Sequence, residues 1–236
     1  MSAPLVYVTV LNFKGEKDTI ECVESLKQQD YDNLEILIID NDSKDGSAEH
    51  LRAHFSEIKL IETGYNFGYA KGNNIGIEEA VKNGADYVLV LNNDTTLEPD
   101  CVRRLVEAME SYQDIALIGP AVYEYFNHEV LTSIGAFMNL KKGEGSFATL
   151  TQAKDGLVDC DYVPGCAIMV RCALLEKIGL IPDAYFMFFE ETEWCFKAKR
   201  AGYRICGCRD AVIYHKESAS MQDMSEFKTH FLGYNR

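Results

Sequence analysis

The stretch VLVLNNDTTLEPD, residues 88–100, begins as an unbroken apolar run and ends in two amides and a carboxylate, Asn92, Asn93 and Asp94. An apolar run without polar alternation is typical of a strand that is buried on both faces, as in a parallel sheet covered by helices. In open parallel sheets, ligands bind outside the carboxyl ends of the strands. The stretch therefore predicts a fold and also the edge of the sheet at which a site should lie.

Short β-type runs alternate with longer amphipathic segments over the first 120 residues. The expected strands are residues 5–11, 34–39, 58–62, 87–91 and 115–118. The expected helices are residues 19–29, 47–55, 70–83 and 97–111. This repeated strand–helix–strand pattern predicts an α/β, Rossmann-like fold with a mostly parallel central sheet and helices on both faces.

After Pro120 the pattern loosens into a Gly-rich, hairpin-like segment, residues 133–150, and helical patterns return at residues 172–178 and 191–201. Because no internal repeat or Pro-rich linker divides the chain, we expect one domain, residues 1–236, with functional halves 1–120 and 121–236. The last residues, MSEFKTHFLGYNR, have a helical pattern without a capping Gly or a polar tail, so we expect a truncated C-terminus.

Composition excludes several classes of protein. A chain of 236 residues with 47% hydrophobic content can bury a sizeable core, and its formal charge of -14 repels a phosphate backbone, so nucleic acid is not an expected partner. The basic run Lys197, Lys199 and Arg200 is typical of a solvated helix face. No apolar run approaches the roughly 20 residues that span a bilayer, which predicts a cytoplasmic protein whose membrane contact, if any, is peripheral.

The eight cysteines lie in apolar or helical contexts, which predicts reduced, buried thiols. Cys206 and Cys208 form a C-x-C pair, but without a second Cys or His pair nearby they indicate zinc only weakly.

Three expected strands end in polar clusters, LNFKG at residues 11–15, DNDSKDG at residues 40–46 and NNDTT at residues 92–96. Each cluster by itself is as typical of a turn or a helix cap as it is of a binding site. Parallel topology would bring the three together along one edge, where Asp40 and Asp42 could accept hydrogen bonds from a ribose and a base.

Glycines recur every four residues in TGYNFGYAKGNNIG, residues 63–76. Gly72 and Gly76 would share one helix face and let the backbone lie close to the sheet. Asn66 and Gly68 precede or open that helix, where amides and backbone N–H groups could meet a diphosphate or ribose. Helix packing and ligand binding both remain open for this stretch.

Asp94 suits a divalent cation, because Mg²⁺ commonly takes one or two carboxylates together with substrate phosphates. The alternative is that Asp94 caps the following helix. Neither G-x-G-x-x-G after the first strand nor G-x-x-x-x-G-K-S/T occurs, so neither a dinucleotide fold nor a P-loop is indicated.

The segments VTVLNFKGEKDTIECVESLKQQDY, IIDNDSKDGS, NFGYAKGNNIGI and VLVLNNDTTLEPD follow one another as in inverting family 2 glycosyltransferases of the GT-A fold. The chain resembles the rhamnosyltransferase-like branch of that family. Its second half is similar there too, since VPGC is followed by an acidic pair in FMFFEETEWCFKAKRAGY. The resemblance covers residues 5–236 and implies a nucleotide-diphospho-sugar transferase fold, with the nucleotide bound by the first half and the acceptor by the second.

The resemblance also assigns roles in nucleotide and metal binding. The nucleotide-binding residues would be Leu11, Phe13, Asp40, Asn66, Gly68 and Asn93, with Asp42 added from its place at a strand end. Asn93 and Asp94 occupy the positions of the family's D-x-D motif, of which only the metal-binding Asp94 keeps its carboxylate. His215 matches a histidine that many members use as a further ligand, which implies a bound Mg²⁺ or Mn²⁺.

The acidic pair supplies the expected catalyst. Glu191 stands where the family carries its catalytic aspartate and would take the proton from an acceptor hydroxyl. The Glu–Glu pair is one methylene longer than the family's Glu–Asp. Gly165, Glu190 and Trp194 would contact the donor or acceptor sugar, although packing in the core is the more common role for a residue such as Trp194.

Together these residues predict a metal-dependent, inverting transferase that moves a sugar from a dTDP- or UDP-sugar, with dTDP-rhamnose favoured, to a hydroxyl of a glycan or lipid-linked saccharide in polysaccharide biosynthesis. A non-catalytic nucleotide-sugar-binding module is the main alternative, because the D-x-D motif is incomplete. A sugar nucleotidyltransferase would need a Gly-rich, basic loop after the first strand, and LNFKGEKDT offers only two lysines. The sugar, the acceptor and the oligomeric state stay open.

Overall fold

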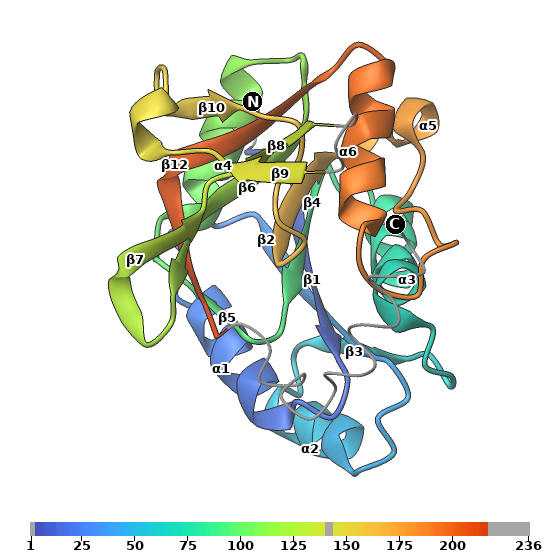
Figure 1. Ribbon diagram of the computed structural model, residues 1–236. Helices are drawn as coiled ribbons and strands as arrows, with labels where there is room; N and C mark the ends of the chain where they lie inside the picture. Colours follow the sequence, from blue (N-terminus) through green and yellow to red (C-terminus); the bar gives the residue numbers. More distant parts are fainter. Residues whose placement is uncertain (1–2, 140–143, 217–236) are drawn as a thin grey trace.

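A computed structural model describes residues 3–139 and 144–216 of the chain (Figure 1). One large mixed sheet forms the centre, in the strand order β10-β12-β6-β11-β4-β1-β2-β3, with β5 paired to β12 and β7 paired to β6. Its strands are β1 Val6–Asn12, β2 Leu34–Asp40, β3 Lys59–Glu62, β4 Tyr87–Asn92, β5 Thr95–Leu97, β6 Ile115–Glu124, β7 Asn127–Ser133, β10 Leu157–Asp159, β11 Ala167–Arg171 and β12 Arg204–His215. A separate hairpin joins β8 Ala136–Asn139 to β9 Glu144–Phe147.

The predicted parallel sheet is confirmed over its first half, where β3, β2, β1 and β4 run parallel to one another. β6 and β12 are also parallel. Between these two groups lies β11, which is antiparallel to both β4 and β6 and which the sequence did not predict. The reversed strand joins the two halves into one continuous sheet.

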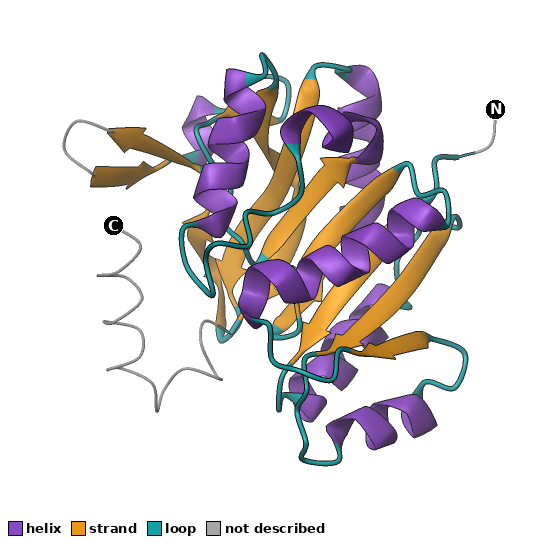
Figure 2. Cartoon of the chain, turned by 90° about the vertical axis from the view of Figure 1, so that its right-hand side faces the viewer, coloured by secondary structure: helices purple, strands orange, loops and turns teal. Residues whose placement is uncertain are grey.

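Helices cover both faces of this sheet (Figure 2). The helices are α1 Glu16–Leu26, α2 Ser47–His54, α3 Gly68–Lys82, α4 Cys101–Ser111, α5 Leu175–Ile178 and α6 Glu190–Arg200. Two short 3₁₀ turns, Leu150–Gln152 and Cys172–Leu174, complete the regular structure. Apolar side chains of α1 and α4 pack on one face, and those of α3, α5 and α6 pack on the other.

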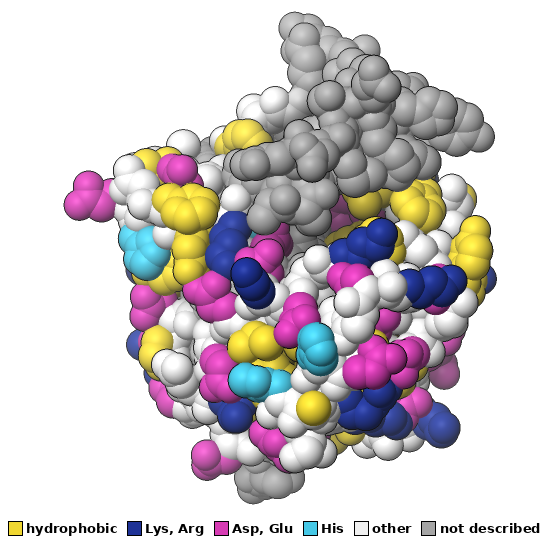
Figure 3. All heavy atoms as spheres, turned by 90° about the horizontal axis from the view of Figure 1, so that it is seen from below, with side chains coloured by type: hydrophobic (Ala, Val, Ile, Leu, Met, Phe, Trp, Pro, Cys, Tyr) yellow, Lys and Arg dark blue, Asp and Glu magenta, His cyan; other side chains and the backbone are white. Residues whose placement is uncertain are grey.

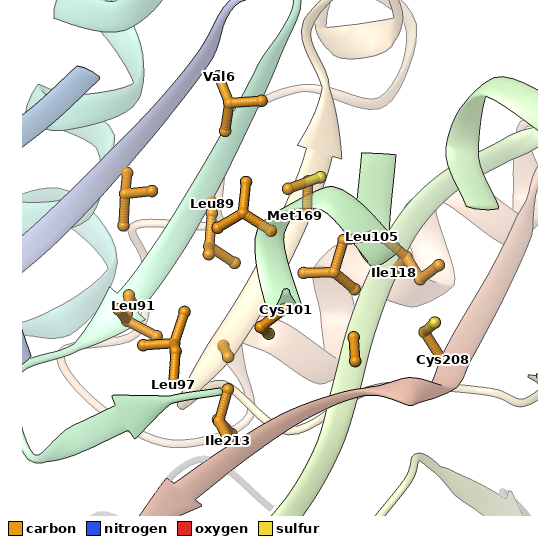
Figure 4. Packing of buried hydrophobic residues seen from close by; sticks show 14 of the residues in the cluster. Val6, Leu89, Leu91, Leu97, Cys101, Leu105, Ile118, Met169, Cys208 and Ile213 are labelled. Carbon is orange, nitrogen blue, oxygen red and sulfur yellow. The ribbon is translucent and has the colours of Figure 1, made fainter. Parts of the chain in front are cut away.

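Strand β4 shows why its sequence lacks polar alternation. Leu89 and Leu91 face the core beneath α4 (Figure 4). Val88 and Val90 face the core beneath α3 and α6. Since successive strand residues point to opposite faces, a strand between two helical layers must be apolar at every position. All four side chains are at most 1% exposed.

The predicted segments 97–111, 133–150 and 224–236 have different outcomes. The helix expected over residues 97–111 begins only at Cys101, because residues 95–97 form β5 and pair with the end of β12. The hairpin expected within residues 133–150 is confirmed as β8 and β9. The helix expected over residues 224–236 lies outside the described residues. Among the described helices, none is long and apolar enough to cross a membrane.

Candidate active site

The ends of three parallel strands meet at one edge of the sheet. Asn12 is the register partner of Asp40, and Leu11 is the partner of Asn92, so the polar clusters that follow β1, β2 and β4 are neighbours. This confirms the predicted placement of the clusters. Figure 3 views the molecule from the side of this edge, where acidic, basic and histidine side chains are interspersed.

Asn12 links the ends of β1 and β2. Its Nδ2 donates to Asp40 Oδ2 at 2.7 Å, and its Oδ1 accepts from the Thr19 hydroxyl at 2.9 Å. Asp40 also accepts from the Ser43 N–H at 3.0 Å and from the Ser43 hydroxyl at 2.6 Å. With 2% exposure and three hydrogen bonds inside the protein, Asp40 holds this turn together. Its predicted contact with a nucleotide stays a prediction.

The other first-half residues surround this cluster. Phe13 is 38% exposed, which leaves its ring accessible at the edge. Leu11 packs against α3, since a Cβ added to Gly72 would lie 2.8 Å from Leu11 Cδ1. Asp42 has a left-handed backbone, φ 65°, and pairs with Lys44 at 2.7 Å. Gly72 therefore serves helix packing, one of the two roles left open for its stretch.

The amide of Asn93 is engaged within the protein. Its Nδ2 donates to the Thr19 hydroxyl at 2.9 Å and to the Gly15 carbonyl at 3.2 Å. These bonds tie the end of β4 to the start of α1. Asn93, one of the two amides that precede Asp94, therefore has a structural use in this chain.

Asp94 and His215 lie together although 121 residues separate them. The Nε2 atom of His215 is 3.1 Å from Asp94 Oδ1, and the Lys216 N–H donates to the Asp94 carbonyl at 3.0 Å. The pairing of β5 with β12, which sets Thr95 opposite His215, produces this contact. The structure thus brings together the two residues predicted to bind metal.

Their chemistry fits a divalent cation that brings further ligands with it. A carboxylate oxygen and an imidazole nitrogen are both accepted by Mn²⁺, and Mg²⁺ is commonly held by one or two protein carboxylates plus substrate phosphates. Within residues 3–139 and 144–216, no group of three or more His, Cys, Asp or Glu side chains could hold a metal ion. A cation at Asp94 could take phosphate oxygens of a nucleotide diphosphate among its further ligands.

The start of α3 is fixed to the end of β2 by Asn41, a residue to which the sequence assigned no role. Its Nδ2 donates to Asn66 Oδ1 at 3.0 Å and to the Gly68 carbonyl at 3.1 Å, and its Oδ1 accepts from the Phe67 N–H at 3.1 Å. Asn66 in turn accepts from the Gly68 N–H at 3.0 Å. Gly68 has φ +75°, a conformation that favours glycine, and a side chain there would collide with Phe186.

The acidic pair opens α6 after two strained residues. Phe188 and Phe189 both have φ 72°, in the left-handed region that costs a non-glycine residue about 1 kcal/mol or more. Glu190 is 4% exposed, and its Oε2 has no hydrogen-bond partner among the described residues. Glu191 is half-buried and accepts from the Thr192 hydroxyl at 3.1 Å.

Burial changes the acidity of both carboxyls. Burial, and then the neighbouring charge of Glu191, raises the pKa of Glu190 to about 8. Burial also raises the pKa of Glu191. Since two adjacent carboxylates in apolar surroundings do not ionise independently, the pair retains a proton to a higher pH than isolated carboxyls would.

Gly165 and Trp194 differ in their relation to this pair. A Cβ added to Gly165 would lie 3.6 Å from Glu191 Cγ, so Gly165 borders the acid pair. Trp194 is 0% exposed and donates from Nε1 to the Gly179 carbonyl at 2.9 Å. The sugar contact predicted for Trp194 disagrees with this complete burial, and the core role that the sequence left open describes it instead.

Lys216 is a further residue that the sequence did not single out. Its Nζ lies 2.6 Å from Asp18 and 2.5 Å from Glu21, both on α1. Together with its backbone bond to Asp94, this ion pairing holds the end of β12 against α1. Sequence separations of 198 and 195 residues left no local pattern from which these pairs could be inferred.

The fold and the polar edge define the class first: this is a nucleotide-diphospho-sugar transferase fold of the GT-A type. This chain superposes on the crystal structure of GalNAc-T7 with UDP, GalNAc and Mn²⁺ with a TM-score of 0.76 at 15% identity. The superposition covers 91% of this chain and 44% of the GalNAc-T7 chain. The likeness shows the fold, and this chain spans less than half of that protein.

The sequence profile of Glycosyl transferase family 2 matches residues 6–179, and the chain belongs to this family. It is 26% identical to the low-salt glycan biosynthesis hexosyltransferase Agl10 of Haloferax volcanii over 238 residues, covering 97% of this chain and 75% of Agl10. It is 22% identical to the dTDP-rhamnosyl transferase RfbF of Shigella flexneri over 212 residues, covering 89% of this chain and 68% of RfbF. The predicted family is confirmed, and rhamnosyltransferases are among its relatives.

Proposed function

We propose that this family 2 glycosyltransferase moves a sugar, with inversion, from a dTDP- or UDP-sugar to a hydroxyl of a glycan or lipid-linked saccharide. The observation that carries the proposal is the contact between Asp94 and His215 at the carboxyl edge of the sheet. It joins a carboxylate and an imidazole where, in folds of this class, a nucleotide diphosphate binds. The dTDP-rhamnosyl transferase among the relatives supports dTDP-rhamnose as the first donor to test.

In this proposal the first half of the chain binds the donor. Phe13 offers an exposed ring to the base, while Asn66 and Gly68 border the diphosphate at the start of α3. Asp94 and His215 would hold Mg²⁺ or Mn²⁺, which when bound offsets negative charge on the diphosphate. The solved relative that contains UDP and Mn²⁺ supports this choice of ligand and ion.

Glu191 acts as the base. The acceptor oxygen attacks the anomeric carbon, the bond from that carbon to the diphosphate oxygen breaks, and the hydroxyl proton passes to the Glu191 carboxylate. Attack on the face opposite the departing diphosphate inverts the configuration. Of the two acids, Glu191 is the one that ionises for this step, because it is partly exposed and accepts a hydrogen bond, whereas Glu190 is deeply buried.

A binding measurement followed by a turnover measurement tests the proposal. Calorimetric titration with dTDP, UDP and GDP, each with Mn²⁺ or Mg²⁺, identifies the nucleotide. Release of nucleotide diphosphate from dTDP-rhamnose, UDP-glucose, UDP-N-acetylglucosamine and GDP-mannose then reports slow donor hydrolysis. We expect dTDP and UDP to bind and dTDP-rhamnose to be hydrolysed; tight binding with no turnover of any donor would favour the non-catalytic module.

A further inference from the structure

The segment that leads into the acid pair is held in place by α3. Asn74 forms a two-way contact with the backbone of Ile181: its Nδ2 donates to the Ile181 carbonyl at 2.8 Å, and its Oδ1 accepts from the Ile181 N–H at 3.0 Å. Five residues further along the segment, the Phe186 carbonyl accepts from the Tyr69 N–H at 2.9 Å. The approach to Glu190 is therefore fastened to α3 at two points.

The Tyr69 side chain reaches the other wall of the acid pair. Its hydroxyl donates to the Gly165 carbonyl. A Cβ on Gly165 would lie 3.4 Å from that hydroxyl oxygen and 3.6 Å from Glu191 Cγ, so Gly165 is enclosed between the two side chains. Burial, and then the charges of Glu190 and Glu191, raises the pKa of Tyr69 well above its ordinary value, so the hydroxyl remains a donor.

The same end of α3 is tied to the nucleotide edge. Asn41, buried at 2% exposure directly after β2, bonds to Asn66 and to the Gly68 carbonyl. The first turn of α3 thus contacts the predicted nucleotide-binding edge on one side and the acid pair's surroundings on the other. The Asn41 bonds do not involve the Tyr69 hydroxyl, so loss of that hydroxyl should leave the tie between α3 and the nucleotide edge in place.

We infer that Tyr69 is a positioning residue for Glu191, acting through Gly165, and that the first turn of α3 holds the Tyr69 side chain in place for this role. The inference rests on the proposed function. Tyr69 contacts neither the nucleotide nor a reacting atom in this scheme. Loss of its hydroxyl should therefore leave nucleotide affinity unchanged and slow the chemical step only through the position of Glu191. This separates it from residues that bind the donor.

Tyr69→Phe tests the inference, because it keeps the ring and removes only the hydroxyl donor. We expect kcat for the donor that wild type hydrolyses fastest in the four-donor panel to fall about tenfold, since small displacements of a catalytic group lower rates steeply. KM for the donor and Kd for dTDP with Mn²⁺ should stay within about twofold. The dTDP stoichiometry and the melting temperature show whether the variant is folded.

Tyr31→Phe is the matched control, because Tyr31 also donates to a backbone carbonyl, that of Pro4, at 2.6 Å and belongs to no part of the site. It should retain wild-type kcat. Glu191→Gln, measured alongside, separates the two proposals. If Glu191→Gln is fully active, or if wild type hydrolyses no donor, the proposed function and the inference are both contradicted. If Glu191→Gln is inactive but Tyr69→Phe keeps its kcat, or loses kcat and nucleotide affinity equally, only the inference is contradicted.

Discussion

Two buried carboxylates in this molecule have opposite surroundings. Asp40, at the end of β2, is 2% exposed and accepts three hydrogen bonds from Asn12 and Ser43. Glu190, at the start of α6, is 4% exposed, and its Oε2 has no partner within the described part of the chain. Burial of a polar group costs free energy unless hydrogen bonds replace those to water. Asp40 therefore supports the fold, whereas Glu190 weakens it.

The backbone shows the same difference. Asp40 begins a turn in which the Ser43 N–H and hydroxyl both donate to its carboxylate, so the turn is stabilised by its own residues. Glu190 follows two phenylalanines in the left-handed region. Strain and unpaired polar groups persist where the surrounding structure enforces them, and they gather at functional sites. The comparison indicates that the turn after β2 is held by its own hydrogen bonds, whereas the start of α6 is held in its conformation by the surrounding structure.

The strongest challenge to this comparison is Glu191→Gln. Removal of the base should lower turnover about 10³-fold, within the range of general base catalysis, while dTDP binding stays unchanged. Glu193→Gln, which changes the same helix at a residue paired with Lys197 at 3.2 Å, should keep wild-type turnover. Substantial turnover by the Glu191 variant, measured as nucleotide release, would remove it as the base.

Asp94→Asn tests the catalytic side of the nucleotide edge. Loss of the carboxylate should lower metal-dependent turnover about a hundredfold and raise the Mn²⁺ concentration needed for half activity. Asp100→Asn is the matched control, because the Asp100 carboxylate pairs with two arginines of α4, Arg103 and Arg104, and lies outside the proposed metal site. If chelators leave turnover unchanged in both wild type and Asp94→Asn, the metal site is wrong.

Asp40→Asn tests the supporting role. The new amide donor would face groups that now donate to Asp40, so at least one buried hydrogen bond is lost, and we expect unfolding free energy to fall by about 2 kcal/mol. Urea unfolding followed by circular dichroism measures it. The exposed Asp32, changed to Asn, should leave the midpoint in place. An unaltered midpoint for Asp40→Asn would mean that the turn does not depend on the carboxylate.

Glu190→Gln should have an effect on stability that depends on pH. Because burial raises the pKa of Glu190 from 4.5 to about 8, its stabilising contribution is full below about pH 4.5 and is lost as pH rises toward 8. The glutamine variant lacks this loss, so we expect its stability relative to wild type to increase progressively as pH rises from 4.5 to 8, with no advantage at pH 4.5. Parallel unfolding curves across this range would contradict the assignment.

Much of the fold followed from apolar patterning. The runs of β1, β2 and β4 have no polar alternation, and their burial on two faces is what that pattern predicts. Apolar patterning did not predict the antiparallel direction of β11, because a buried strand has the same apolar pattern in either direction. The short β5 was also missed, since its pairing depends on β12, more than 100 residues later.

The site was predictable where a strand end carried it. Asp94 and the acid pair stood out as polar residues after apolar runs, and His215 was found through family resemblance. Asn12 and Asn41 stood beside the residues that were chosen, but nothing local distinguishes an amide that joins two strand ends from one that makes an ordinary turn. The Tyr69 contact with Gly165 spans 96 residues and depends on packing alone.

The reversed β11 places residues of the second half of the chain at the carboxyl edge of the sheet. Because it runs against β4, its beginning lies beside the end of β4, and the Asn92 N–H donates to the Cys166 carbonyl at 2.9 Å. A parallel strand in that place would have delivered Gly165 to the far end of the sheet. One change of strand direction therefore places Gly165 and Cys166 beside the end of β4 without a long connection across the molecule.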